Sequence, residues 1–190
     1  MSMLRAHIDE PMDGSRERNI FGAFALMISD DIVRASSSRA PQAGPAASAL
    51  ALLAHKPGLS ISMLAVGVGL SHAGTVRLLD RLSAEGLIER REHSTDGRTR
   101  SLFLTTAGKI ASDHVLASRD EVIAAGLSVI SSDEIKLLCD IAERVLRSRL
   151  ENLAHSYRVC RLCCYEGCKN CPVDAELLER GVDREHTDDG

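Results

Sequence analysis

The chain has 190 residues, 44% of them apolar, and carries a formal net charge of −4. This length suits one domain with or without an extension, and the apolar fraction is enough for a real core, which excludes a disordered chain. No apolar run approaches the roughly 18 residues of a membrane span, and the N-terminal stretch lacks the apolar segment and cleavage site of a signal peptide, so we expect a cytoplasmic protein.

The N-terminal part of the chain is predicted to be helical. Residues 1–16 are polar and are expected to be loose. From Asn19, apolar residues recur every four positions, a spacing that places them on one face of a long helix. A second helix is expected from Ala46 to His55. We assign residues 17–56 to an N-terminal dimerisation helix and this second helix.

Residues 57–108 carry the element order of a winged helix-turn-helix. Ser60 and Ser71 are both well placed as N-caps, each in front of a short helix. Gly86 suits the left-handed residue that ends the second of these helices. Two strand candidates and a polar loop between them follow. Such an order is typical of a device that reads duplex DNA with a helix and a wing.

Residues 109–159 are expected to form long C-terminal helices. One is predicted over residues 106–127, and a capping box at residues 131–134 predicts the start of the next. Apolar residues of that next helix recur every three or four positions as far as Leu153. Together with the first helix of the chain, this stripe predicts a seam with a second copy, and an intramolecular core is the alternative. The fold class is therefore mainly α with a small β wing (α+β), a winged helix-turn-helix flanked by N- and C-terminal dimerisation helices.

Several short motifs occur in a fixed order between Ser60 and Gly108. They are Leu64-Ala65, Gly69-Leu70-Ser71, the VRLLDRL of residues 76–82, the GLIER of residues 86–90, Asp96-Gly97-Arg98 and the LTTAG of residues 104–108. With these motifs the stretch resembles the multiple-antibiotic-resistance regulator (MarR) family of bacterial transcription factors. The resemblance implies a homodimeric winged helix-turn-helix regulator that is commonly a repressor and is not an enzyme. It does not cover the C-terminal Cys-rich extension.

Eight residues of the second short helix and the wing are candidates for DNA contact. The N-terminus of a helix favours a phosphate, outward side chains reach base edges or phosphates, and an arginine at the wing tip suits a narrow minor groove. These candidates are Ser71, His72, Thr75, Arg77, Arg81, Asp96, Arg98 and Arg100. The MarR resemblance implies that Asp96 holds Arg98 in place, and solvated surface charge is the alternative for the arginines. Two-fold pairing of such helices predicts a pseudo-palindromic operator.

Residues 160–190 form a Cys-rich segment followed by an acidic tail. Two C-x-x-C pairs occur there, and because cytosolic cysteines are normally reduced we interpret them first as a metal site. The predicted ligands are Cys160, Cys163, Cys168 and Cys171, with Cys164 as a substitute. Tetrahedral Zn²⁺ is favoured, while an iron–sulfur cluster, a thiol–disulfide switch and no metal at all are the alternatives. Cys139 is expected to be a buried residue of a helix.

The sequence thus favours a transcription regulator, a repressor, that binds double-stranded DNA as a homodimer. Modulation by a small ligand or by the metal or redox state of the cysteines is expected. Members of the resembled family bind small aromatic effectors, and the residues that would line such a pocket are Phe21, Phe24, Met27 and His55, for which plain core is the alternative. The other interpretation of the whole chain is a metal- or redox-sensing thiol protein or an interaction module whose winged helix does not bind DNA. Catalysis is disfavoured, since no catalytic triad order, phosphate-binding glycine loop or histidine metal triad stands out.

Overall fold

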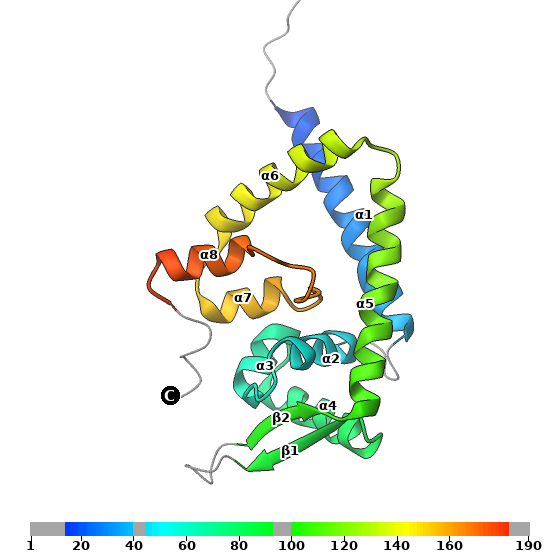
Figure 1. The fold of residues 1–190 in the computed structure, drawn as a ribbon, viewed down its shortest axis with the longest axis vertical. Helices are drawn as coiled ribbons and strands as arrows, with labels where there is room; N and C mark the ends of the chain where they lie inside the picture. The colour runs from blue at the N-terminus through cyan, green and yellow to red at the C-terminus, as the bar shows by residue number, and fades with distance from the viewer. Residues whose placement is uncertain (1–13, 40–44, 93–99, 183–190) are drawn as a thin grey trace, which may run out of the picture.

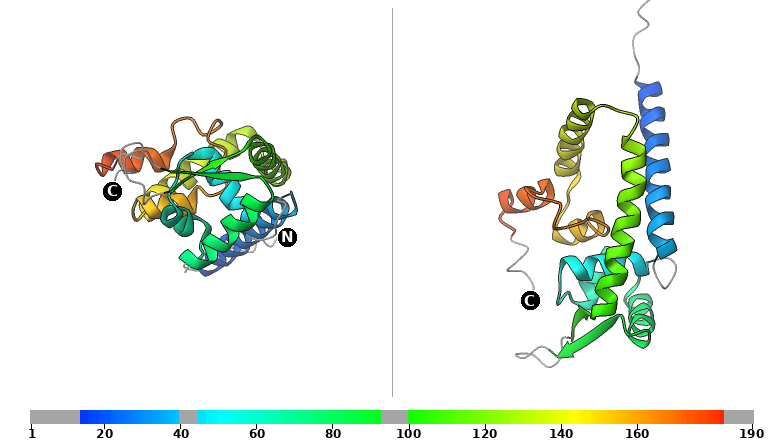
Figure 2. Two further views of the ribbon diagram at one scale, coloured as in Figure 1. Left: turned by 90° about the horizontal axis from the view of Figure 1, so that it is seen from below. Right: turned by 45° about the vertical axis from the view of Figure 1, so that its right-hand side comes forward.

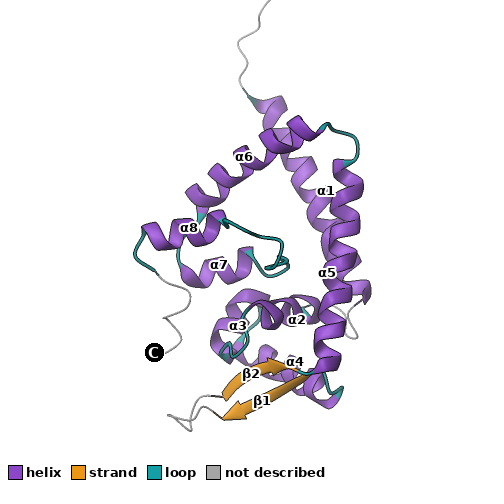
Figure 3. Cartoon of the chain, viewed as in Figure 1, coloured by secondary structure: helices purple, strands orange, loops and turns teal. Residues whose placement is uncertain are grey.

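The computed structural model describes residues 14–39, 45–92 and 100–182 (Figure 1). Helices dominate, and two short strands form the wing, which confirms the predicted fold class (Figure 3). In chain order the elements are α1 (Ser15–Arg39), α2 (Ala46–His55), α3 (Ile61–Val68), α4 (His72–Ala84), β1 (Ile88–Glu92), β2 (Arg100–Leu104), α5 (Thr106–Leu127), α6 (Ser132–Arg149), α7 (Leu153–Val159) and α8 (Pro172–Glu179). The segment predicted to be loose lies, as far as residue 13, outside these described ranges.

Both predicted N-caps of the helix-turn-helix are present. The Ser60 hydroxyl accepts a hydrogen bond from the backbone N–H of Met63, and the Ser71 hydroxyl accepts one from the N–H of Gly74. Between the two helices, Gly69 adopts a left-handed conformation with a φ of 71°. A residue with a β-carbon rarely adopts this conformation, so the glycine allows the chain to leave α3 and turn into α4.

The wing is joined to the helices on both sides by backbone and side-chain hydrogen bonds. Gly86 ends α4 with a φ of 69°, and the N–H of Leu87 donates to the carbonyl of Leu82 at 2.9 Å, as expected for a Schellman-type ending. Strands β1 and β2 then pair in antiparallel register. Beyond β2, the Thr105 hydroxyl accepts from the N–H of Gly108 and donates to the carbonyl of Gly86 at 2.6 Å. The base of the wing is thereby fixed to the start of α5.

One apolar core holds the winged region together. Its members come from α2, α3, α4, both strands, α5 and α7, and most of them are leucines at 0–1% exposure. The buried set is Ala46, Ala49, Leu50, Leu52, Leu53, Leu59, Leu64, Leu78, Leu79, Leu82, Leu87, Ile88, Leu102, Ala111 and Tyr157. Helix α2 lies in the middle of this core, and eight of its ten residues are buried.

Helices α1 and α5 lie side by side and rise away from the winged region (Figures 1 and 2). A second, smaller apolar cluster joins them to α2 through Ala47, Ala51 and Val115. Leu162, from the segment after α7, belongs to the same cluster. The Cys-rich segment is therefore packed against the body of the protein through this leucine.

The C-terminal part departs from the sequence prediction at several points. The helix expected to continue to Leu153 ends at Arg149, Leu150 is extended, and Asn152 caps a new helix, α7, by accepting from the N–H of His155. Helix α7 packs on α3 with Tyr157 fully buried, so this short helix contributes to the core of its own chain. The dimerisation role assigned to residues 109–159 stays a prediction. Helix α8 was not predicted.

The prediction that Cys139 is buried is also wrong, because this residue lies on an exposed face of α6. The capping box at the start of α6 is confirmed: Ser131 and Glu134 exchange side-chain and backbone hydrogen bonds.

Within the described ranges no single helix is both long and apolar enough to span a membrane. The pair α3 and α4 reaches that length and composition jointly, with a bend of 99° between the two helices.

Candidate DNA-binding surface and cysteine cluster

Helix α4 has one apolar and one cationic face. Leu78, Leu79 and Leu82 are buried in the main core. Arg77 and Arg81 are exposed, and neither forms an ion pair with another residue in the part of the chain that the structure describes. His72 is exposed as well, in the first turn behind the Ser71 cap. The outer surface of α4 thus presents two guanidinium groups, and the His72 imidazole lies at the N-terminus, which is the positive end of the helix dipole.

Thr75 lies elsewhere than the sequence analysis placed it. Its side chain is fully buried, and its hydroxyl donates to the carbonyl of Ser71 at 3.0 Å. Because the residue is on the core side of α4, it fixes the first turn from inside and does not face the outer surface. We therefore leave Thr75 out of the DNA-binding surface.

An ion pair that the sequence analysis missed joins α4 to the wing. Arg90 of β1 lies 2.6 Å from the carboxylate of Asp80 on α4. On the same strand, Arg91 pairs with Glu89 and stacks over the ring of Phe103 at 4.3 Å. Strand alternation does predict that the two arginines point to opposite faces, but it does not identify their partners. The Arg90–Asp80 pair therefore joins the wing to α4, whereas the contacts of Arg91 lie within the wing.

The remaining predicted DNA contacts are at the tip of the wing. Asp96 and Arg98 lie outside the described residues. Arg100 begins β2, and its side chain is likewise outside what the structure describes.

The cysteines form a compact turn between α7 and α8. Cys160 ends α7, and its carbonyl accepts from the N–H of Cys163 at 2.9 Å. In the second C-x-x-C pair, Asn170 has a φ of 57°, a conformation that asparagine adopts more readily than most residues. The carbonyl of Cys171 then accepts from the N–H of Ala175, and this hydrogen bond is the first of α8. The backbone therefore doubles back between the two pairs.

The four predicted ligand thiols are neighbours. A hydrogen bond from the Cys160 thiol lowers the pKa of Cys163, and donation to Cys160 is the main cause that raises the pKa of Cys171. Burial, the charge of Cys171 and a hydrogen bond to it raise the pKa of Cys168 to about 11. The thiols thus influence one another's pKa. Among the described residues, however, no three His, Cys, Asp or Glu side chains are already arranged around a common point as a bound ion requires.

A cavity of about 270 Å³ lies between α1, α5 and the segment that enters the cysteine turn. Its walls are mostly apolar, with Arg119 of α5 and Arg161 as the cationic members. The lining residues are Ala25, Ile28, Ser29, Ile32, Val33, Arg119, Val159, Arg161, Leu162 and Cys163. Sequence reasoning had no signal for this cavity, since its walls come from three segments far apart in the chain.

The residues predicted to line an effector pocket are not brought together. Phe21, Phe24 and Met27 are 42–63% exposed on α1 and do not line the cavity. His55 ends α2, where its ring meets Tyr165 edge-on at 4.4 Å between centroids.

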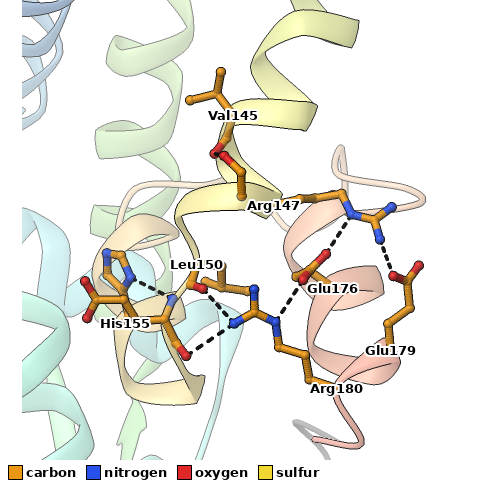
Figure 4. A network of polar contacts seen from close by, with 9 residues as sticks. Val145, Arg147, Leu150, His155, Glu176, Glu179 and Arg180 are labelled. Carbon is orange, nitrogen blue, oxygen red and sulfur yellow. Dashed lines mark hydrogen bonds and ion pairs between the residues drawn. The ribbon is translucent and has the colours of Figure 1, made fainter.

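A polar network connects α8 to α6 (Figure 4). Glu176 accepts from Arg147 at 2.9 Å and from Arg180 at 2.8 Å, and Arg147 also pairs with Glu179. Arg180 donates a further hydrogen bond to the carbonyl of Leu150 at 2.7 Å. The hydrogen bonds from Arg147 and Arg180 hold the pKa of Glu176 below its ordinary value.

Comparison with known proteins agrees with this architecture. Residues 43–99 match the MarR family. The HTH-type transcriptional repressor YetL of Bacillus subtilis is 34% identical over 91 residues, which are 46% of this chain and 54% of YetL. The chain thus spans about half the length of this curated relative, which is named as a regulator and not as an enzyme.

Two solved structures share the fold. The YusO protein from Bacillus subtilis aligns with a TM-score of 0.56 at 24% identity, covering 70% of this chain and 94% of YusO. A MarR family protein from Bacillus stearothermophilus aligns with a TM-score of 0.63 at 19% identity, covering 74% and 98% of the two chains. The chain therefore has a winged helix-turn-helix fold in which residues 43–99 match the MarR family, and a Cys-rich C-terminal extension follows it.

Proposed function

We propose that the protein is a sequence-specific DNA-binding transcription regulator, and specifically a repressor. The observation that carries the proposal is the two-faced helix α4: its leucines are in the core, while Arg77 and Arg81 are exposed without ion-pair partners in the described part of the chain. The repressor name of the curated relative supports the same conclusion. In this arrangement α4 enters the major groove, and the phosphate backbone meets the N-terminus of the helix.

Each candidate residue has a separate role in this proposal. Arg77 and Arg81 contact base edges or phosphates from the outer face of α4, and His72 does so from its first turn. Arg98 enters the minor groove from the wing, where negative potential concentrates in narrow A·T tracts, and Asp96 holds it there. Arg100 contacts the backbone.

The proposed regulator works as a homodimer on a pseudo-palindromic operator. Helix α6 has no buried residue, although its apolar stripe is well formed. Helix α1 likewise exposes large apolar side chains. The exposed set on these two helices is Ile20, Phe21, Phe24, Leu26, Met27, Val33, Leu137, Ile141, Val145 and Leu146. Two such faces in one chain exceed what a monomer commonly exposes, and a second copy would bury both.

A small effector is part of the proposal, and its place is the cavity beside α1 and not the predicted Phe21 surface. Apolar walls with two guanidinium groups, Arg119 and Arg161, favour a compact aromatic or aliphatic acid. A bound acid would connect α1 and α5 to the segment that carries the cysteines.

The test is a fluorescence-anisotropy titration of a labelled duplex from the protein's own promoter region. Arg77→Ala and Arg98→Ala are each expected to weaken binding by about 5- to 100-fold, the effect of losing one base or groove contact. Arg149→Ala removes an exposed arginine from α6 and is the matched control, expected to leave affinity unchanged. Equal affinity of all three variants and the wild type would instead support a thiol protein or interaction module whose winged helix does not bind DNA.

A further inference from the structure

Arg158, near the end of α7, lies against the turn between the two helices of the helix-turn-helix. A β-carbon built on Gly69 would be 2.6 Å from the Nη1 atom of Arg158, 3.5 Å from its Cζ and 3.6 Å from its Nη2. Gly69 ends α3 and is followed, after Leu70, by Ser71, the cap of α4. The guanidinium thus occupies the space in which any other residue at position 69 would have its side chain.

The backbone that carries Arg158 is held firmly beside α3. Helix α7 packs on α3 (Figure 1), and Tyr157, the residue before Arg158, is 0% exposed in the main core. Ser156 is buried as well, and its hydroxyl donates to the carbonyl of Leu153 at 2.6 Å. The guanidinium of Arg161 donates to the carbonyl of Arg158 at 2.7 Å. The side chain of Arg158 therefore starts from a fixed position next to the helix-turn-helix.

The charge of Arg158 is not used within the chain, unlike that of the other arginines in residues 150–182. Arg180 pairs with Glu176 and donates to the carbonyl of Leu150. Arg161 donates to a carbonyl and lines the cavity beside α1. Arg158 is exposed, and no carboxylate in the described part of the chain pairs with its guanidinium. This cation is therefore free to bind an anion of another molecule.

The elements that meet at Arg158 contain no acidic residue near it in the sequence. The chain has none between Lys56 and Asp80, a stretch that covers α3, the turn and the first two turns of α4, and it has none within α7. Asp80 itself is paired with Arg90 of the wing. Although the whole chain has a net charge of −4, α3, α7 and the start of α4 supply no carboxylate that would repel a phosphate here.

The turn that Arg158 covers is a place where a helix-turn-helix meets the DNA backbone. In this motif the first helix crosses the backbone and the second enters the major groove, so the turn between them lies at the edge of the groove, beside a phosphodiester strand. Arginine is well suited to such a strand, because its planar guanidinium donates two parallel hydrogen bonds to one phosphate. Phosphate contacts of this kind fix the position of the protein on the duplex and carry no sequence information.

We propose that Arg158 binds a DNA phosphate beside the turn between α3 and α4, so that the C-terminal extension contributes to the DNA-binding surface. The inference rests on the proposed regulator function and adds to it a contact from α7. This contact lies outside residues 43–99, which match the MarR family, and it is separate from the candidates on α4 and the wing. The extension is then part of the DNA-binding unit and not an appendage to it.

The experiment measures binding of the full chain to a labelled duplex from its own promoter region and to an unrelated duplex of equal length, at salt concentrations from about 50 to 200 mM. Arg158→Gln removes the charge and keeps the aliphatic start of the side chain. It is expected to weaken binding to both duplexes by the same factor, about 3- to 10-fold, and to reduce the slope of log affinity against log salt concentration by about 1. Arg158→Lys keeps the charge and is expected to bind within about 2-fold of the wild type.

Arg149→Gln, the same substitution at an exposed arginine of α6, is the control and is expected to change neither the affinity nor the slope. Circular dichroism and the thermal midpoint check that the variants remain folded. The proposal is overturned if Arg158→Gln binds like the wild type, if it loses affinity for the promoter duplex alone, or if affinity falls while the slope stays the same, which would mean that Arg158 only supports the turn. A wild-type protein that binds neither duplex would instead overturn the regulator function itself, and with it this inference.

Discussion

The winged region and the C-terminal extension are stabilised in different ways. In the winged region, apolar side chains from five helices and both strands meet in one core, and most of them are leucines that are essentially inaccessible to solvent. In the extension, a few buried side chains are supplemented by ion pairs between α6 and α8 and by a turn of cysteines. The first region depends on apolar burial and the second on polar and thiol contacts.

This difference determines which part can respond to a signal. Apolar burial of this extent changes little with solution conditions, whereas ion pairs that are partly exposed contribute little and are screened by salt. The extension is thus expected to open locally at lower free energy than the winged region. Because α7 contributes Tyr157 to the main core and packs on α3, local opening of the extension is expected to change the packing of α3.

The largest predicted change in the free energy of unfolding comes from removing a buried side chain from the core of the winged region. Leu79→Ala removes a fully buried side chain from α4 and is expected to lower the free energy of unfolding by about 2–5 kcal/mol. Leu178→Ala, on α8 with its side chain 61% exposed, is the control and is expected to change it by less than about 0.5 kcal/mol. Urea denaturation followed by circular dichroism measures both. Similar losses in the two variants would show that burial does not separate the two regions.

Local signals in the sequence were enough to predict the winged region. Ser60, Ser71 and Gly86 mark helix ends by hydrogen bonds or backbone conformations that involve only near neighbours. Helix α2 and helix α5 were predicted with the observed bounds from their apolar spacing, and Thr105 caps α5. Where local preference and burial favour the same structure, a single sequence is sufficient to predict that structure.

Other features of the structure could not be predicted, because they depend on contacts between residues far apart in the sequence. The apolar repeat continues through Leu153, yet Leu150 is extended because it packs with Val173 and Leu177 of a later segment. Thr75 was assigned to the DNA surface from its place in the first turn of α4. Its side chain is instead buried in the core, because it lies on the face of α4 that packs against the rest of the winged region. The cavity with Arg119 requires three distant segments to meet.

A second, smaller effect tests how tightly the wing joins α5. A β-carbon on Gly108 would lie 1.9 Å from the backbone carbonyl oxygen of Leu87. Gly108→Ala therefore forces the wing and α5 apart and is expected to lower the free energy of unfolding by about 1–3 kcal/mol. Gly22→Ala has open space around it on α1 and is expected to raise it by up to about 1 kcal/mol. Thermal denaturation compares the two, and a stabilised Gly108→Ala protein would contradict the close approach of the backbones.

The smallest predicted effect concerns the ion pairs between α6 and α8 in the extension, and it depends on pH. The arginines hold the pKa of Glu176 below its ordinary value, so the stabilisation is present above the unfolded-state pKa and is lost as pH falls through the lower, folded value. We expect α8 to remain docked on α6 from neutral pH to about pH 5 and to loosen below about pH 4. Glu176→Gln removes the carboxylate and is expected to loosen α8 already at pH 7 and to flatten this pH dependence.

Hydrogen exchange of peptides that cover residues 172–182, corrected for the intrinsic exchange rate at each pH, measures the docking of α8. Glu121→Gln, an exposed carboxylate on α5, is the control and is expected to leave the exchange of α8 unchanged. Equal protection of α8 in Glu176→Gln and the wild type at pH 7 would mean that the arginine network does not hold the helix. The attachment of α8 would then rest on Val173, Leu177 and the cysteine turn alone, and the difference between the two regions would lie in the thiols and not in the ion pairs.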